Sequence, residues 1–349
     1  MRPEPITSNV PGSLAWHVWH ERHPAMFEQI IAAHPYPASI AGALRGLLDE
    51  TLHGPGWLDE PFLSAESRFY HRLLDAVRFF DDGAWRGVDP FAFLKNAELA
   101  SAPLDGLAEL SILEAMHAAL WGNQADLGFR IGVAAVTGSG VLGKADNLVV
   151  DDSSAAVAAL GSARRIALVA DNAGRELLAD LVLADHLLAA GRADEFAVHV
   201  KPMPYYVSDA TTADLVACLT RLAAGPPPAA ALAGRLRAAA ADGRFIVTTH
   251  EFHCTPSEFS DAPADLFAGA DVVVFKGDLN YRRLVGDLRW APTVPFGQTV
   301  ARFPAPVVAL RTLKSDVVVG LSADVVSRLD AEAPDWRVSG RYAMVQVRV

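Results

Sequence analysis

The spacing of apolar residues divides the chain into two parts. Up to about residue 115, apolar residues recur every three or four positions, which is the period of one face of an α-helix. The segments with the clearest spacing are residues 19–34, 39–52, 67–80 and 109–121. Pro-Gly and Gly-Pro pairs such as Pro11-Gly12 interrupt this pattern. The first third of the chain is therefore predicted to be helical.

From about residue 130 the pattern changes to short runs rich in β-branched residues. These runs are apolar on both faces, as expected of strands buried between two layers of helices. They occupy residues 163–171, 196–202, 244–250, 271–277 and 306–312. Helical patterns at 174–191 and 210–225 lie between some of them, and this alternation predicts a parallel α/β sheet. The proline-rich segment 223–234 is expected to be a surface loop or a connection between helices.

Composition and charge narrow the class of protein. Hydrophobic residues make up 51% and charged residues 20% of the 349 positions, which excludes a disordered or fibrous chain. This length suits one large or two ordinary domains. The net charge of −11 makes a nucleic-acid partner unexpected, because neutralisation of phosphates drives that binding. It does not argue against a small phosphorylated ligand, since a local site can be positive.

The cysteines and the apolar runs indicate the compartment. Cys218 and Cys254 are too few for a disulfide framework or a four-thiolate zinc site, and they fit a reducing compartment. The first residues lack the apolar core of a secretory signal. No run approaches the roughly 18 apolar residues of a membrane span. We therefore expect a cytoplasmic protein without a membrane partner, and the sequence predicts no oligomeric state.

Polar side chains follow the predicted strands, and open α/β sheets bind ligands at the carboxyl ends of their strands. In chain order these side chains are Asp171 and Asn172, then Lys201, Ser208 and Asp209, then Lys276 and Asp278, and finally Arg311 and Lys314. The amide, hydroxyl and carboxylate groups could simply cap helices. Capping does not explain the cations, which are disfavoured at helix N-termini. Oxygen ligands beside cations and helix N-termini suit a divalent metal with a phosphate, and predict metal-assisted phosphoryl transfer to water.

A second candidate element, with the sequence WGNQADL, spans residues 121–127 at the junction of the helical part and the sheet. Junctions of this kind often form ligand pockets. Gly122 could equally end one helix while Asn123 or Asp126 begins the next, so both interpretations stay open.

Three other patterns resemble known functional motifs but lack a feature that each motif requires. GSGVLG at residues 138–143 matches a dinucleotide motif, but turn and strand residues follow it where a helix is required. His250 and His253 lack the spacing of a zinc-binding HExxH helix, although a loop site near the substrate stays open. Asp171-Asn172 lacks the second aspartate of the haloacid-dehalogenase type. Neither a GxSxG elbow nor a phosphate-binding GxxxxGK[ST] loop occurs.

Taken together, these residues resemble the metal-dependent damage-control phosphatase family, formerly domain of unknown function 89. The similarity is to its sugar-phosphate phosphatase branch, which includes the eukaryotic acidic-residue methyltransferase 1 proteins. The similar segments keep the order of the family along nearly the whole chain, at 13–30, 68–80, 121–127, 171–188, 198–211, 270–287 and 309–321. The chain departs from the family at Gln124, usually a basic residue there, and near His253, where a tryptophan is expected.

The resemblance implies a three-layer α/β/α domain with a mainly parallel, Rossmann-like sheet over residues 119–349, after a helical region over residues 1–118. It implies a divalent metal, Mn²⁺ or Mg²⁺ with Co²⁺ or Ni²⁺ also compatible, held by Asp171, Asn172 and Asp209. The contacts that it implies for phosphate or substrate are Asn123, Asp126, Glu176, Lys276, Arg311 and Lys314.

The resulting hypothesis is hydrolysis of phosphomonoesters of small sugar phosphates, such as fructose 1-phosphate, in metabolite damage control. Lys276 and the metal would stabilise the developing charge. Asp171 or Asp209 would orient the attacking water, unless Asp171 is itself the nucleophile. The alternatives are a carboxyl methyltransferase that uses S-adenosylmethionine, for which the strand-end cations are poorly suited, and a non-catalytic binder of sugar phosphates, which would not need a complete metal triad.

Overall fold

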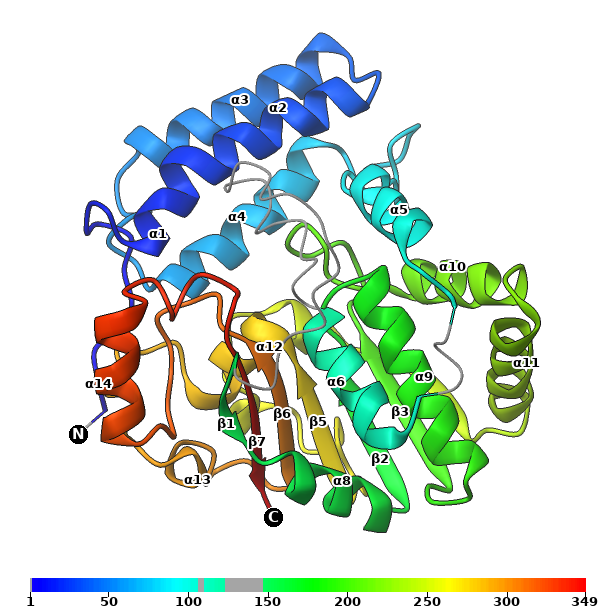
Figure 1. Cartoon of the computed structure of the whole chain (residues 1–349). Helices are drawn as coiled ribbons and strands as arrows, with labels where there is room; N and C mark the ends of the chain where they lie inside the picture. The colour runs from blue at the N-terminus through cyan, green and yellow to red at the C-terminus, as the bar shows by residue number, and fades with distance from the viewer. Residues whose placement is uncertain (1, 106–109, 123–146) are drawn as a thin grey trace.

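The computed structural model describes residues 2–105, 110–122 and 147–349, and a seven-stranded sheet runs through its centre (Figure 1). The strands are β1 (Leu148–Asp151), β2 (Arg165–Val169), β3 (Glu195–Val200), β4 (Phe245–Thr249), β5 (Val272–Lys276), β6 (Val307–Thr312) and β7 (Ala343–Arg348). Their order is β1-β7-β6-β5-β2-β3-β4. The five strands from β6 to β4 are parallel, whereas β7 is antiparallel to β6 and parallel to β1. The predicted mainly parallel sheet is confirmed.

Both faces of the sheet are buried, which explains why its strands are apolar at nearly every position. Successive side chains of a strand point to opposite faces. Val169 and Phe275 therefore join one hydrophobic core, while Leu168 and Val274 join the other. Helices cover the sheet on both sides, so the three-layer α/β/α architecture is confirmed.

One layer consists of α6 (Ile112–Gly122), α8 (Ser153–Ser162), α9 (Arg175–Ala189), α10 (Thr212–Ala223) and α11 (Pro227–Ala241). Helix α9 is buried along most of its length, and α6 packs on it. The two backbones approach closely at Gly122, where a Cβ atom would lie 2.8 Å from the Cα of Glu176. Gly122 thus allows the contact that brings the end of α6 to the start of α9.

The hydrophobic core on the other face of the sheet is shared by the N-terminal helices, namely α1 (Leu14–His17), the π-helical turn η1 (Val18–Arg22), α2 (His23–Ala33), α3 (Ala38–His53), α4 (Phe62–Ala76) and α5 (Ala92–Ser101). It is also shared by α12 (Gly277–Val285), α13 (Phe296–Thr299) and α14 (Ala323–Glu332). Trp19, Phe27 and Phe69 share one core with Phe275 of the sheet. In Figure 1 the blue N-terminal helices lie above the sheet edge at which α12 begins. The N-terminal helices thus lie on the side of the molecule where ligands of parallel sheets bind.

Two parts of the fold differ from the sequence-based expectation. The proline-rich segment 223–234 was expected to be a surface loop or a connection between helices, but most of it belongs to α11 itself. Pro227 occupies the first turn of that helix, where a backbone N–H has no helical partner in any case, and the alanines that follow favour a helix. Strand β7 was not predicted, because Gln346 and Arg348 interrupt its apolar run.

The predicted division of the chain at residue 118 falls within α6, which packs on the sheet layer, and it stays a prediction. In the described part of the chain, every helix is too short or too polar to cross a membrane.

Candidate active site

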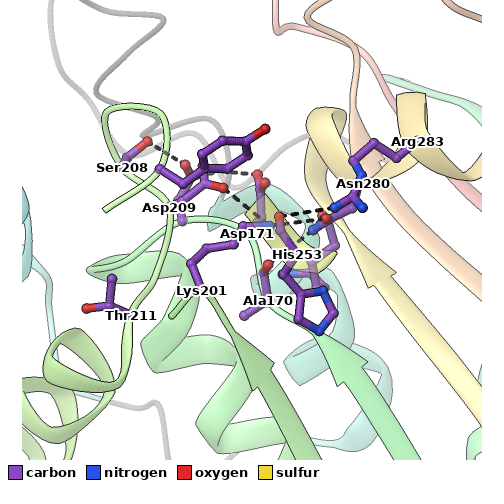
Figure 2. A network of polar contacts seen from close by, with 12 residues as sticks. Ala170, Asp171, Lys201, Ser208, Asp209, Thr211, His253, Asn280 and Arg283 are labelled. Atoms are coloured by element: carbon purple, nitrogen blue, oxygen red, sulfur yellow. Dashed lines mark hydrogen bonds and ion pairs between the residues drawn. The ribbon is translucent and has the colours of Figure 1, made fainter. Parts of the chain in front are cut away.

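The loops after β2 and β3 are joined to each other and bring Asp171, Asn172 and Asp209 together. A β-bridge links Asn172 to Asp209. The amide of Ala210 donates to the carbonyl of Asp171 at 2.7 Å, and the amide of Ala173 donates to the carbonyl of Ser208 at the same distance. Asp171, Asn172 and Asp209 are buried, each at most 5% exposed. Figure 2 shows Asp171 and Asp209 converging from the two loops.

A cavity opens at this sheet edge. Asp171, Asn172 and Asp209 line its floor, and Asp278 of α12 and Lys314 after β6 line the adjoining wall. The opposite wall comes from the N-terminal helices and is described below. The structure thus gathers the three predicted metal ligands and one predicted phosphate contact, Lys314, around a single cavity.

The three floor residues fit a divalent cation by their chemistry. Two carboxylates and an amide oxygen are the hard donors that Mg²⁺ and Mn²⁺ prefer. The Nδ2 atom of Asn172 donates to Asp171 Oδ2 at 2.8 Å and to Glu176 Oε2 at 2.9 Å, and its Oδ1 atom accepts from the hydroxyl of Ser208. No cluster of three His, Cys, Asp or Glu side chains within the described ranges could hold a metal. The mixed set of two carboxylates and one amide is therefore the candidate metal site.

The N-terminus of α12 adjoins this set. Gly277 begins the helix with a φ of 78°, a left-handed conformation that favours glycine. A Cβ atom at this position would overlap the carboxylate of Asp171. Glycine therefore allows Asp171 to lie against the helix N-terminus, whose partial positive charge stabilises anions such as a carboxylate or a phosphate.

Lys276 lies behind the cavity floor and not on the cavity surface. Its ammonium group is fully buried and donates to Asp180 Oδ1 at 2.7 Å, Glu176 Oε1 at 2.8 Å and the carbonyl of Ala119 at 2.9 Å. These three bonds use all its donors. The structure thus places the predicted contacts Lys276 and Glu176 next to Asn172, where they orient its amide.

The charges around Lys276 are strongly coupled. Burial lowers the pKa of Lys276, but Asp180 and Glu176 outweigh that effect, so the pKa is raised and the ammonium stays charged. Burial, assisted by the charge of Glu176, raises the pKa of Asp180 to about 7 against the opposing effect of Lys276. Lys276 therefore stays protonated, and Asp180 is the carboxyl group of this cluster whose pKa lies near neutral pH.

The side chain of Arg311 forms hydrogen bonds within the protein and does not line the cavity. Its guanidinium donates to Asp278 Oδ1, Ser315 Oγ and the carbonyl of Val317, and it lies over the ring of Tyr281. These bonds fix the turn after β6, and that turn presents Lys314 to the cavity. Of the two cations predicted there, Lys314 faces the cavity and Arg311 supports its loop.

Some predicted elements lie outside the described residues. They are Asn123, Asp126 and the glycine-rich segment 138–143. The candidate element at residues 121–127 is therefore described only at Trp121 and Gly122, which end α6.

Two supporting residues had no role assigned to them by the sequence, although Lys201 was among the cations at the strand ends. Lys201 is buried after β3, with its Nζ atom 3.4 Å from Asp209 Oδ2 and 3.5 Å from Asn280 Oδ1. Asn280 of α12 in turn donates to the carbonyls of Ala170 and Lys276 (Figure 2). The position of Lys201 at the end of an apolar strand indicated a buried, paired cation. The only sequence feature that could indicate Asn280 is its position one turn into the helix.

The histidines of the 250–254 segment do not line the cavity. This segment forms the short helix η5 (Glu251–Cys254), and His253 Nε2 lies 3.2 Å from Nδ1 of His199 on β3. Burial and then the charge of His250 lower the pKa of His199 to about 4. Burial and then the charge of Lys201 lower the pKa of His253 further. Both rings are therefore neutral near pH 7.

A sheet covered on both faces, with a polar cavity at the carboxyl ends of its parallel strands, defines an α/β protein of the kind that binds its ligand at that edge. A family model described as the damage-control phosphatase ARMT1-like domain matches residues 18–329. The chain belongs to this family.

Individual relatives and a solved structure agree with the assignment. The chain is 32% identical over 335 residues to the damage-control phosphatase ARMT1 of Danio rerio, an alignment that covers 83% of this chain and 74% of the relative. It is 29% identical over 349 residues to the Homo sapiens protein of the same name, with 86% and 77% covered. The fold is similar to that of a DUF89 family protein from Pyrococcus horikoshii, with a TM-score of 0.53 and 18% identity over 95% of this chain and 98% of the other.

The contact between Gly277 and Asp171 can be tested with Gly277→Ala. We expect the free energy of unfolding to fall by more than about 2 kcal/mol, because the new Cβ atom displaces the Asp171 carboxylate. Metal binding should weaken for the same reason. Gly191→Ala is the matched control, since Gly191 also has a positive φ but open space around it. Urea denaturation and titration with Mn²⁺ measure both effects. Equal behaviour of the two variants would contradict the proposed contact.

The role of Lys276 can be tested with Lys276→Met. Leaving Glu176 and Asp180 buried without their cation should cost about 3–5 kcal/mol of stability. Lys95→Met is the control, because Lys95 is equally buried against Asp89 and Asp214 but lies away from the cavity. Both variants should lose stability in urea, whereas only Lys276→Met should also weaken Mn²⁺ binding. Unchanged metal binding by folded Lys276→Met would show that Asn172 does not depend on this lysine.

The buried histidine pair predicts a pH dependence of stability. Below a pH of about 6.5 the unfolded chain protonates His199 and His253 while the folded chain does not, so the free energy of unfolding falls as the pH falls. Each histidine contributes about 1.4 kcal/mol per pH unit in that range. His253→Phe should therefore reduce the slope between pH 6.5 and 5 by about this amount. Parallel slopes of wild type and variant, from urea denaturation at each pH, would rule this out.

Proposed function

We propose that this chain is a metal-dependent phosphatase that hydrolyses phosphomonoesters of small sugar phosphates. The observation that carries the proposal is the gathering of Asp171, Asn172, Asp209 and Lys314 around one cavity beside the N-terminus of α12. Metal ligands, a cation and a helix N-terminus at one point suit a phosphoryl group and the charge that develops on it. Membership of a damage-control phosphatase family supports the same reaction class.

Asp171, Asn172 and Asp209 would hold the divalent cation, with Mn²⁺ or Mg²⁺ preferred and Co²⁺ or Ni²⁺ compatible by ligand type. When bound, the cation supplies Lewis acidity at the phosphoryl group. Lys314 binds phosphoryl oxygens from the side of β6, and the backbone N–H groups at the start of α12 add further donors.

The attacking oxygen requires a carboxylate nearby. Asp171 or Asp209 would orient a water molecule and accept its proton, which passes to the sugar oxygen as its bond to phosphorus breaks. Alternatively, Asp171 itself attacks the phosphorus and displaces the sugar oxygen, which takes up a proton, and water then hydrolyses the resulting acyl phosphate. Lys276 contributes from behind the floor, where it fixes Glu176 and, through Glu176, the amide of Asn172. In this assignment Lys276 acts on the position of a metal ligand.

The cavity supports a small substrate. The N-terminal helices face the floor across it and bring both apolar and polar side chains, namely Leu14, Val18, Arg22, Phe62 and Glu66. A mixed wall of this kind suits a polyol better than a wholly apolar group. The two cysteines are free and buried, which supports a reducing compartment such as the cytoplasm.

Asp171→Ala tests the assignment directly. Phosphate release would be measured from a panel of sugar phosphates and p-nitrophenyl phosphate, with Mn²⁺, Mg²⁺, Co²⁺, Ni²⁺ or EDTA. We expect metal-dependent release by the wild type and a loss of at least about 100-fold in Asp171→Ala, because a metal ligand and the orienting carboxylate are removed together.

Asp194→Ala is the matched control, since Asp194 is an exposed aspartate paired with Arg164. This variant should keep full activity. Retained activity in Asp171→Ala would refute the assignment. If folded wild type released no phosphate with any metal, the methyltransferase or the binder would be favoured, and binding of S-adenosylmethionine would separate those two.

A further inference from the structure

The cavity wall opposite the metal ligands carries polar side chains that the phosphoryl chemistry does not use. Glu66 of α4, Tyr206 of the loop after β3 and Arg282 of α12 all line it. They are buried, with exposed fractions of 2%, 8% and 6%. Buried polar groups normally have hydrogen-bond partners within the protein. A buried group at the cavity that lacks such bonds can therefore form them with a ligand.

The charges of Arg22 and Arg282 act on Glu66, and two basic groups near it, on His23 and Arg282, lie beyond hydrogen-bond distance. Its Oε1 atom lies 4.0 Å from His23 Nε2, and its Oε2 atom lies 3.8 Å from Arg282 Nη1. Burial lowers the pKa of His23 well below its usual value, so this ring is neutral and does not pair with the carboxylate. Arg282 donates to Asp287 through Nε at 2.7 Å and Nη2 at 3.0 Å. Glu66 thus faces the cavity without a close ion pair to either neighbour.

The backbone of Tyr206 is strained, and its ring is held by aromatic packing. Its φ of 53° lies in the left-handed region, which is strained for a bulky residue by about 1–2 kcal/mol. The ring packs against Tyr70 and Tyr205, with centroid distances of 4.6 and 4.9 Å. Its hydroxyl is buried and lies beside the Glu66 carboxyl group, with no hydrogen bond of good geometry to a described residue. Strain combined with an unsatisfied polar group is typical of functional sites.

The neighbouring tyrosine provides the contrast within the same loop. Tyr205 is also buried, but its hydroxyl donates to Ser67 Oγ at 2.6 Å. Tyr205 does not belong to the cavity lining, whereas Tyr206 does. Two adjacent residues of the same type therefore differ in two respects, since only Tyr205 makes a well-formed hydrogen bond within the protein and only Tyr206 lines the cavity.

We propose that Glu66 and Tyr206 form a hydroxyl-binding subsite for the part of the substrate that remains after phosphate leaves. This inference rests on the proposed phosphatase function and specifies which feature of the substrate the same site recognises. A polyol offers hydroxyl donors to the Glu66 carboxyl group and acceptors to the Tyr206 hydroxyl. Arg282 is a positioning residue, because its bonds to Asp287 hold its guanidinium near Glu66.

The subsite explains how one cavity can combine general phosphoryl chemistry with a choice of substrate. The metal ligands and Lys314 contact groups that every phosphomonoester possesses. Glu66 and Tyr206 contact groups that only hydroxylated substrates possess. A site built to hydrogen-bond a substrate hydroxyl discriminates against analogues that lack it, because its own polar groups then stay unpaired.

The test compares fructose 1-phosphate, which is a polyol, with p-nitrophenyl phosphate, which has no hydroxyl groups on its leaving group. The measured quantity is the ratio of their kcat/KM values in wild type, Tyr206→Phe, Glu66→Gln and the control Tyr205→Phe. We expect the ratio to fall about 5- to 10-fold in Tyr206→Phe and about 10- to 100-fold in Glu66→Gln. The fall should come from a higher KM for fructose 1-phosphate, as for loss of a binding contact. Tyr205→Phe should keep the wild-type ratio.

Thermal unfolding separates this role from a structural one. Tyr205→Phe loses a hydrogen bond to Ser67 and should have a lower melting temperature. Tyr206→Phe removes a hydroxyl that makes no hydrogen bond of good geometry with a described group, so its melting temperature should fall less than that of Tyr205→Phe. A wild type that releases phosphate, together with an unchanged ratio in both Tyr206→Phe and Glu66→Gln, would overturn the subsite alone. A wild type that releases phosphate from neither substrate with any metal would overturn the phosphatase itself.

Discussion

The site depends on one buried ammonium group. Lys276 ends β5, and its three hydrogen bonds reach Glu176 and Asp180 on α9 and the carbonyl of Ala119 on α6. A buried charge is tolerated only when it is paired and fully hydrogen-bonded, so the sheet and these two helices must keep one relative position. Because Glu176 also accepts from the amide of Asn172, this constraint extends to the cavity floor. The geometry of the candidate metal ligands is thereby fixed by a contact that the substrate does not reach.

Close backbone approaches make this arrangement possible. Gly122 lets α6 meet the start of α9, and Gly277 lets Asp171 lie on the N-terminus of α12. Any side chain at either position would push apart elements that Lys276 holds together. The two glycines and the lysine thus act jointly, since the glycines provide the space and the lysine provides the attraction. Helix N-termini and oxygen ligands then meet at the carboxyl edge of the sheet, as the topology of a parallel sheet favours.

The sequence predicted the sheet and the edge at which polar residues gather, but it did not predict which way each cation points. A residue that follows a parallel strand must lie at the carboxyl edge, so the approach of Asp171, Asn172 and Asp209 to one another follows from strand order. Position at the end of a strand leaves the direction of a long side chain open. Lys276 and Arg311 turn into the protein, where carboxylates and carbonyls receive them, while Lys314 faces the cavity. The carboxylate partners lie on the helices α9 and α12, and no pattern around the two cations indicates them. Glu66 and Arg282 were missed for the same reason, since more than 200 positions separate two residues of one wall.

The floor of the cavity and its opposite wall differ in how their polar groups are bonded. The floor is held together before any ligand binds, because Asn172 donates to Asp171 and Glu176 while Lys201 pairs with Asp209. The opposite wall keeps Tyr206 in a strained backbone conformation, with a buried hydroxyl that makes no hydrogen bond of good geometry in the described part of the chain. Natural proteins retain such costs where a ligand offsets them, and the aromatic packing of Tyr206 against Tyr70 keeps the loop folded in the meantime. A preorganised floor suits a reaction that is common to all phosphomonoesters, whereas a wall with unused hydrogen-bonding capacity suits the choice among them.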